Sequence, residues 1–165
     1  MITPLIPDNE AQRMAALRAL LILDTPPEER FDKITRFART EFDLPIALIT
    51  LVDHDRQWFK SNQGLDVCET TRSVSFCGHA IHEPETMVVN NALEDERFHD
   101  NPLVLGAPGI RFYAGAVLRL PMGAAVGTLC VIGTEPRPWT DVDRSILCAL
   151  RDLVVEELVR REDTT

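Results

Sequence analysis

The sequence predicts an α+β fold, in which helices from both ends of the chain flank a largely antiparallel β-sheet. Three observations support this. Apolar residues recur at helical spacing near both termini, and the middle of the chain contains two pairs of short apolar runs joined by turn residues. The chain has 165 residues, of which 45% are hydrophobic and 26% charged. This composition is typical of a soluble globular protein that buries one core.

The first two predicted elements are helices. Residues 10–23 carry apolar side chains at helical spacing, and the prolines at 26–27 end that helix because proline cannot continue it. Thr25 is suited to cap a second helix, with Pro26 at its first position. Pro45 ends this second helix.

The next part of the chain predicts two β-hairpins. The run at 46–52 is apolar and rich in β-branched residues, as in a central strand, and turn residues separate it from a second strand at 56–63. The segments 110–120 and 125–132 form the second hairpin around a Pro-Met-Gly turn. Together these segments predict an antiparallel sheet.

The remaining segments are shorter, apart from the last. A short helix is expected near 76–82 and a strand at 87–90. Residues 91–109 are rich in Asn, Asp, Gly and Pro, which indicates a long loop of the kind that often serves as a functional flap. Thr140 and Asp143 predict a capped helix that closes the chain.

The charge and the cysteines exclude several classes of protein. The net charge of −9 argues against binding to nucleic acid or to an anionic membrane, because both need a positive field. No apolar run approaches the roughly 18 residues that span a bilayer, and no secretory signal is visible, so a cytoplasmic protein is expected. The four cysteines include no Cys-x-x-Cys pair, so reduced thiols are expected rather than a zinc knuckle.

Six stretches of the chain resemble the GAF family, in particular the GAF domains at the N-terminus of bacterial sensor histidine kinases and diguanylate cyclases. These stretches are Leu23–Glu28 with Arg30–Asp32, Asp53–Lys60, Ser75–Ile81, Asp95–Pro102, Ile110–Gly115 and Gly127–Ile132. The resemblance implies a PAS-related central antiparallel sheet, with N- and C-terminal helices on one face and a ligand pocket on the other. It predicts one domain at 10–161, between tails at 1–9 and 162–165.

The resemblance also implies a function. A GAF domain of this kind is a sensory module in bacterial signal transduction, which binds a small molecule or a partner and has no catalytic output of its own. A kinase or a cyclase is the expected output partner. The Asn-Lys…Phe…Asp-Glu signature of cyclic-nucleotide-binding members has no counterpart here, so no cofactor or ligand is assigned.

The stretch from Ser75 to His79 contains the most reactive side chains. Cys77, His79 and His82 could bring soft ligands together for a metal, or Cys77 could be an activated thiolate. The alternative, which we favour, is that Cys77 packs in the core and the histidines make local hydrogen bonds. A bilin site is disfavoured, because Cys77 and His79 are not the adjacent Cys-His pair that such GAF domains use.

Aromatic and polar residues in the matched stretches predict the pocket. Because side chains alternate along a strand, Phe112 and Tyr113 must point to opposite faces of the sheet. The glycines at 115, 123 and 127 lie in or beside a hairpin, so they do not form a phosphate cradle. The predicted ligand-binding residues are Trp58, Phe59, Ser75, Phe76, Cys77, His79, Asp95, Phe98, Arg111, Phe112, Tyr113, Thr128 and Cys130.

Two other functions stay open. A thiol-dependent reductase similar to the free methionine sulfoxide reductases would bring Cys68, Cys77 and Cys130 together. A purely structural dimerisation module would use the helices. The apolar positions of the last helix fall near an a/d seam, so a homodimer through the terminal helices is expected; these positions are Leu147, Leu150, Val154 and Leu158.

Overall fold

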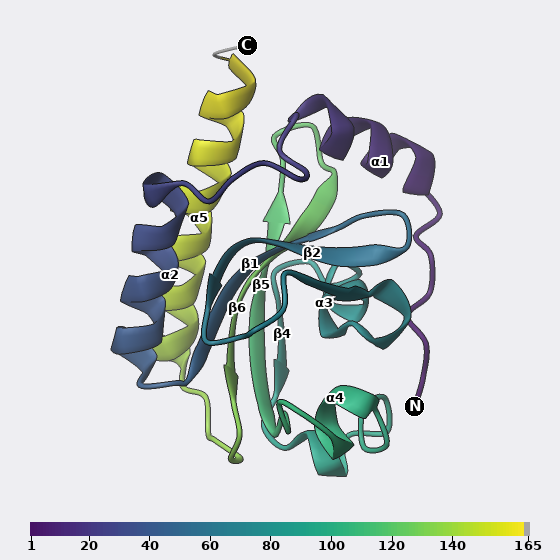
Figure 1. Cartoon of the computed structure of the whole chain (residues 1–165), viewed down its shortest axis with the longest axis vertical. Coiled ribbons are helices and arrows are strands. Elements are labelled where there is room, and N and C mark those ends of the chain that lie inside the picture. Colours follow the sequence, from purple (N-terminus) through teal and green to yellow (C-terminus); the bar gives the residue numbers. More distant parts are fainter. Residues whose placement is uncertain (164–165) are drawn as a thin grey trace.

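The computed structural model describes residues 1–163 and the side chains of 1–160. A six-stranded antiparallel sheet in the order β3-β2-β1-β6-β5-β4 forms its centre (Figure 1), which confirms the predicted α+β fold. The strands are β1 (Ile46–Val52), β2 (Arg56–Gln63), β3 (Glu69–Thr71), β4 (Thr86–Val89), β5 (Phe112–Arg119) and β6 (Ala125–Gly133).

Helices cover both faces of the sheet. On one face α2 and α5 lie side by side, and on the other face lie α3, α4 and the loops around them (Figure 1). None of the described helices is long and apolar enough to cross a membrane. The helices are α1 (Glu10–Ala19), α2 (Glu29–Phe42), α3 (Phe76–Ala80), α4 (Pro102–Leu105) and α5 (Asp141–Asp163), with 3-10 turns η1 (Arg72–Val74) and η2 (Ala92–Glu94).

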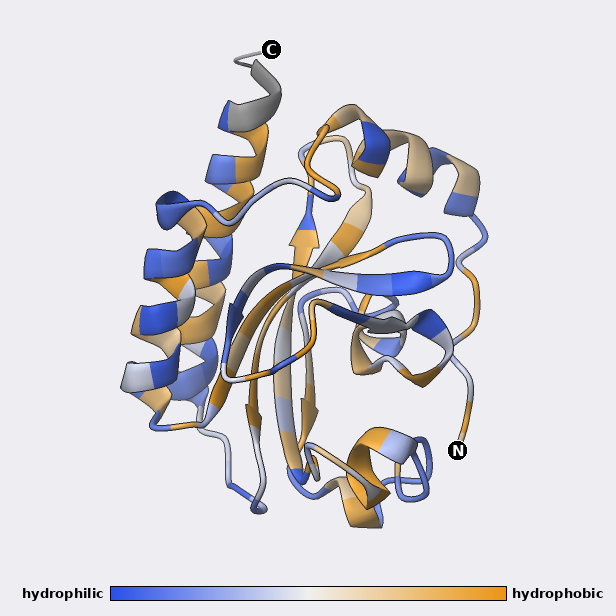
Figure 2. Cartoon of the chain, viewed as in Figure 1, coloured by the Kyte–Doolittle hydropathy of each residue, from blue (hydrophilic) through white to orange (hydrophobic). Residues whose placement is uncertain are grey.

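The face covered by α2 and α5 holds a mainly apolar core, in which the hydroxyls of Thr35 on α2 and Ser61 on β2 are hydrogen-bonded at 2.7 Å. Side chains from alternate positions of the strands, such as Phe112 and Leu129, pack there against the buried sides of the helices. The hydropathy colouring shows the same arrangement: the outer surface of α2 is mainly hydrophilic, while the central strands are hydrophobic over much of their length (Figure 2). This layer is the main stabilising core of the domain.

The last helix begins as predicted. The backbone N–H of Asp143 donates to Thr140 Oγ1, and the N–H of Thr140 donates to Asp143 Oδ2, both at 3.0 Å, so the predicted capping box is confirmed. The expected a/d seam, by contrast, faces its own sheet: Leu147, Val154 and Leu158 are fully buried and contribute to the core of one chain. The homodimer therefore stays a prediction that this stripe does not support.

The first two helices are shorter than predicted. The first ends at Ala19, since Leu21 and Asp24 have left-handed backbone conformations. The second begins at Glu29, and Thr25 does not cap it. Instead Thr25 Oγ1 accepts a hydrogen bond of 2.8 Å from Lys60 Nζ, because the buried amine on β2 draws the connecting segment onto the sheet. This tertiary contact takes the place of the local cap.

The predicted terminal tails differ from the described structure in one respect. The N–H of Ile2 donates to the carbonyl of Arg97, and the carbonyls of Ile2 and Leu5 lie 2.9 and 2.8 Å from the Nε2 atoms of His79 and His82. The segment 1–9 is thus bound along α3. Of the tail expected at 162–165, the last two residues lie outside the described part of the chain.

Candidate ligand site

A cavity of about 380 Å³ lies between the sheet and the segments that cross the face opposite α2 and α5. Strands β1, β2, β5 and β6 form its floor, while α3 and the segment 103–110 cover it. Val67, which is 51% exposed, lies at its mouth. The walls are mostly apolar and include Leu48, Phe59, Leu65, Leu103, Ile110 and Ile132.

A cluster of hydroxyl and thiol groups, which we call the floor cluster, lies at the base of the cavity. Thr50 Oγ1 donates to Cys77 Sγ at 2.9 Å, and the hydroxyls of Thr128 and Tyr113 lie 3.1 and 3.3 Å from the same sulfur. Cys130 lies two positions from Thr128 on β6, so its side chain is on the same face of the sheet. All five residues are almost completely buried, and Cys77, Tyr113 and Cys130 face the cavity directly.

The register of the sheet assembles this cluster. Thr50 of β1 is directly opposite Thr128 of β6, and their hydroxyls are 3.0 Å apart. Gly115 of β5 is opposite Cys130, and a Cβ at position 115 would lie 2.4 Å from the hydroxyl oxygen of Tyr113. The glycine therefore leaves the space in which the Tyr113 ring lies against the sheet.

The environment separates the acidities of the two thiols. Burial raises the pKa of Cys77, but hydrogen bonds from Cys130, Thr128, Thr50 and Tyr113 outweigh burial and place this pKa below its usual range. Burial and the hydrogen bond to Cys77 both raise the pKa of Cys130. Burial likewise raises the pKa of Tyr113. These opposite shifts make Cys77 the more acidic of the two thiols.

Aromatic rings hold α3 above the floor cluster. The ring of Phe76, which lines the cavity, stacks on Phe98 with centroids 3.9 Å apart, and it also contacts Tyr113. Phe98 lies behind this wall and does not line the cavity. The expected flap at 91–109 contains η2 and α4, so it is more regular than the sequence indicates.

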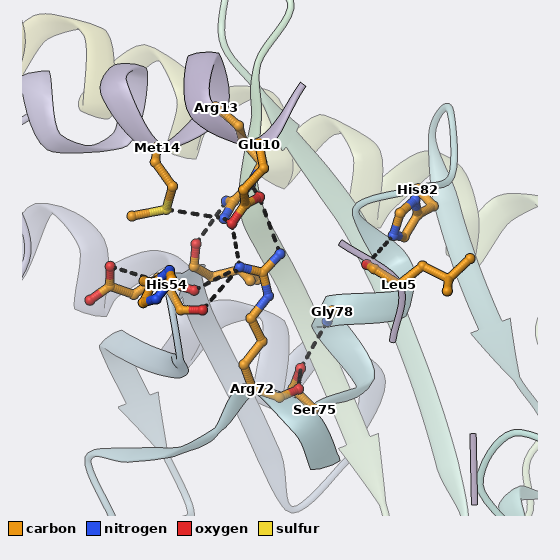
Figure 3. A network of polar contacts seen from close by, with 11 residues as sticks. Leu5, Glu10, Arg13, Met14, His54, Arg72, Ser75, Gly78 and His82 are labelled. Atoms are coloured by element: carbon orange, nitrogen blue, oxygen red, sulfur yellow. Dashed lines mark hydrogen bonds and ion pairs between the residues drawn. The ribbon is translucent and has the colours of Figure 1, made fainter. Parts of the chain in front are cut away.

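A network of charged groups anchors α3 to α1 (Figure 3). The carboxylate of Glu10 lies between two guanidinium groups, 2.7 Å from Arg13 Nε and 2.5 Å from an Nη atom of Arg72. Arg72 begins η1, the turn before α3, and its carbonyl accepts a hydrogen bond from the hydroxyl of Ser75. Ser75 in turn caps α3, because its Oγ accepts the N–H of Gly78. This network links the helix that carries Cys77 to α1.

The structure separates the predicted site residues by their position relative to the cavity. Those that line the cavity are Phe59, Phe76, Cys77, Tyr113 and Cys130. Thr128, Ser75 and Phe98 support them from behind. Trp58 and Phe112 point to the opposite face of the sheet, into the core under α2 and α5, as strand alternation requires for Phe112 once Tyr113 faces the cavity.

The other predicted polar residues bind neighbouring parts of the chain. Asp95 pairs with Arg97 at 2.8 Å, and Arg111 donates to the carbonyls of Val104 and Ile110. Burial lowers the pKa of His79, whose ring lies against the N-terminal segment. Among the described residues no group of three possible metal ligands comes together, and Cys77 lies in the floor cluster rather than with the histidines.

Several residues that line the cavity are not among the predicted ligand-binding residues. They include Leu48, Gln57, Leu65, Val67, Leu103 and Ile110. Strand alternation could have found Leu48 and Gln57, because these two lie an even number of positions from Thr50 and Phe59. No sequence signal identifies the residues outside the strands, because they line the cavity only as a result of how their loops fold over the sheet.

The charged side chains that line the cavity are all acidic. Among the described residues that line the cavity there is no Lys, Arg or His, and the charged ones are Asp66 and Glu69 at its mouth, of which Glu69 pairs with Arg56 at 3.0 Å. An anionic ligand would therefore lose its hydration without gaining a cation. The arrangement suits a neutral or cationic molecule with a mostly apolar body.

Comparisons with known proteins give the family. The model of the GAF domain matches residues 26–158. A cyclic di-GMP phosphodiesterase from Pseudomonas aeruginosa is 43% identical over 159 residues, which are 96% of this chain and 27% of the relative. The chain thus spans about a quarter of the length of that relative.

Two solved structures show the same fold at low sequence identity. The GAF domain of a phosphoenolpyruvate-protein phosphotransferase from Acinetobacter has a TM-score of 0.65 at 16% identity, with 93% of this chain and 96% of that chain covered. A free methionine-R-sulfoxide reductase from Neisseria meningitidis has a TM-score of 0.66 at 15% identity and covers 100% of this chain and 99% of its own. With the family match over most of the chain, these findings show that this protein belongs to the GAF domain family.

Proposed function

We propose that the domain is a sensory module whose cavity binds a small, mostly apolar molecule that is neutral or positively charged. The observation that supports this most is the apolar cavity with an acidic mouth and no basic side chain among its described lining residues. Its volume of about 380 Å³ suits a small metabolite. Nucleotides, including cyclic ones, are disfavoured because their phosphates need a positive partner.

The expected mechanism uses the segments that cover the cavity. A ligand would contact Leu103 and Ile110 in the segment 103–110 and Phe76 on α3 at the same time. If these segments exchange between two arrangements, the ligand shifts the equilibrium toward the one that it binds more tightly. The size of the shift is set by the difference between its two affinities. The Glu10–Arg72 contact would then transmit a movement of α3 to α1. Rearrangement of the terminal helices is the signal that we expect a partner to read.

We infer that the regulated output is a signalling enzyme. The family resemblance implies a kinase or a cyclase, and the name of the Pseudomonas relative adds a cyclic di-GMP phosphodiesterase. Since this chain spans only 27% of that relative, its activity is not assigned to this domain. A cytoplasmic location and a homodimer belong to the same proposal.

A variant in which a large side chain blocks the mouth of the cavity tests ligand binding. In Val67→Trp the new ring would fill the mouth of the cavity, while the matched control Val142→Trp adds the same ring to an exposed position on α5. Neutral and cationic small molecules that raise the melting temperature of the natural chain should raise that of Val142→Trp equally, because a native-state binder stabilises by mass action. They should have no effect on Val67→Trp. Equal shifts in both variants, or shifts only with anionic nucleotides, would contradict the proposal.

A thiol-dependent reductase is the second candidate. It is supported by the two thiols that line one cavity, Cys77 and Cys130, whereas Cys68 is exposed outside it. This function predicts continuous reduction of a sulfoxide substrate by an added dithiol, and the turnover should end in Cys77→Ser. The sensory function predicts no turnover by the natural chain.

A further inference from the structure

The surroundings of the Cys77 sulfur are unusual for a packed core cysteine. Three hydroxyls converge on it from β1, β5 and β6, at 2.9, 3.1 and 3.3 Å. Thr50 donates to the sulfur, and the hydroxyls of Thr128 and Tyr113 are close enough to donate to it once it is a thiolate, which they would stabilise much as backbone donors stabilise an oxyanion. No lysine or arginine is among these partners, so the donors alone supply the stabilisation.

A second thiol lies next to this sulfur and faces the same space. Cys130 lies two positions from Thr128 on β6 and so on the same face of the sheet, and Thr128 Oγ1 is 3.1 Å from Cys77 Sγ; both cysteines line the cavity. Cys77 lies on the five-residue helix α3, whereas Cys130 lies on the central strand β6. Formation of a disulfide would require α3 to carry Cys77 toward the sheet until the two sulfurs are roughly 2.05 Å apart.

We propose that Cys77 and Cys130 are a redox-active thiol pair that hydroperoxides oxidise to a reversible disulfide, with Cys77 as the attacking sulfur. The proposal goes beyond ligand binding and depends only on the cavity and the floor cluster. A hydroperoxide is uncharged and small enough to enter an apolar cavity with an acidic mouth. Neither thiol is exposed on the outer surface, so the oxidant must reach them through the cavity.

The hydroperoxide would oxidise the two thiols in two steps. The Cys77 thiolate, whose proton has gone to solvent, attacks the terminal peroxide oxygen; an S–O bond forms, the O–O bond breaks, and the leaving alkoxide takes a proton to become an alcohol. The thiol of Cys130 then attacks the Cys77 sulfur. The S–S bond forms, the S–O bond breaks, and the hydroxide leaves with the proton of Cys130 as water. The two sulfurs together lose two electrons, which the peroxide gains.

The other cysteines provide internal controls. Cys68 is exposed on the loop before β3, and Cys148 is half-buried on α5, where burial raises its pKa. Neither is hydrogen-bonded to a second cysteine in the described contacts. If exposure alone governed oxidation, Cys68 would react first; if the floor cluster governs it, Cys77 reacts first.

The test treats the reduced full chain with one equivalent of cumene hydroperoxide and follows the intact mass and the cysteine peptides. We expect the natural chain to lose two hydrogens, to yield a linked Cys77–Cys130 peptide pair, and to recover its mass with dithiothreitol. Cys130→Ser should instead gain one oxygen on Cys77 that dimedone traps. Cys148→Ser, the matched control, should behave like the natural chain.

A second variant separates chemistry from folding. Thr128→Val keeps the shape of the side chain but removes one donor to Cys77. We expect the pH profile of Cys77 alkylation by iodoacetamide to move to higher pH, and oxidation at neutral pH to slow about tenfold, as for a loss of about one pKa unit. The proposal would be overturned by oxidation of Cys68 or Cys148 before Cys77, by oxygen addition without the Cys77–Cys130 link, or by an unchanged pH profile in Thr128→Val.

Discussion

The two faces of the same sheet are built from neighbouring residues and yet differ in chemistry. On β5, Phe112 points into the core under α2 and α5, while Tyr113 points to the cavity. On β6, Leu129 and Val131 join that core, while Thr128 and Cys130 join the floor cluster. Under these strands one face is filled mainly with hydrocarbon, while the other keeps a cluster of polar groups beside open space.

This difference indicates which face serves stability and which serves function. A fully packed apolar layer supplies most of the free energy of folding. Buried hydroxyls and thiols beside an unfilled cavity contribute less, because each polar group must be desolvated and hydrogen-bonded to be tolerated. The helix-covered face can therefore support a site whose own groups are not optimised for stability.

The largest expected effect lies in the helix-covered core. Phe112→Ala removes a fully buried ring that packs beside Trp139. We expect the free energy of unfolding to fall by about 3–5 kcal/mol, as for other large-to-small core substitutions. Urea unfolding measures it, and Leu153→Ala on the exposed side of α5 is the control, at less than about 0.5 kcal/mol. Similar losses in the two variants would contradict the division between the faces.

The charged anchor of α3 is expected to contribute next. Burial raises the pKa of Glu10, but hydrogen bonds and charges from Arg13 and Arg72 outweigh it and lower this pKa from 4.5 to about 2. Because the folded-state pKa is the lower one, the stabilisation is fully present above about pH 4.5 and is lost as the pH falls toward 2. We expect a contribution of about 2–3 kcal/mol, allowing for the partial exposure of the carboxylate.

Glu10→Gln tests this contribution directly. The difference in unfolding free energy between the natural chain and this variant should be largest near pH 7 and should shrink steadily below about pH 4.5. Glu29→Gln, at an exposed ion pair on α2, is the matched control and should show almost no difference at any pH. A pH-independent difference for Glu10→Gln would show that the anchor does not act through its charge.

A smaller effect is expected from the glycine under Tyr113. In Gly115→Ala the new Cβ would lie 2.4 Å from the hydroxyl oxygen of Tyr113, so the ring must move. We expect a loss of about 1–3 kcal/mol from overpacking, together with a higher pKa of Cys77 because one donor is displaced. Unfolding and the pH profile of Cys77 alkylation measure the two parts. An unchanged pH profile would contradict the role of Gly115 in placing Tyr113.

The smallest expected effect is that of the tyrosine hydroxyl itself. Tyr113→Phe keeps the ring in place and removes one partner of Cys77 and of Thr128. We expect the unfolding free energy to change by about 1 kcal/mol or less, since both partners keep other hydrogen bonds. A loss as large as that of Phe112→Ala would place Tyr113 in the stabilising core and remove the contrast between the faces.

The sequence predicted the elements well where local signals decide them. The capping box at Thr140 and the opposite orientations of Phe112 and Tyr113 follow from local chemistry and strand alternation. The start of α2 was missed because Thr25, a good cap by itself, bonds Lys60 from a distant strand. Local propensity cannot anticipate such a tertiary partner.

The site could be predicted only in part. The matched motifs contained Cys77, Tyr113 and Cys130, but the floor cluster needs the register between β1 and β6, which sets Thr50 opposite Thr128. Strand register depends on pairing across the whole sheet and cannot be read from one strand. The sequence therefore supplied candidate side chains, and the sheet decided which of them meet.

Binding of a neutral apolar dye tests the central claim, that the cavity face is a ligand site, most directly. A titration with Nile red should show one dye bound per chain in the natural protein and in Val142→Trp, with affinity at least about tenfold weaker in Val67→Trp, whose ring plugs the mouth. An anionic dye of similar size should bind weakly to all three. Equal binding of Nile red to the two tryptophan variants, or a preference for the anionic dye, would contradict the claim.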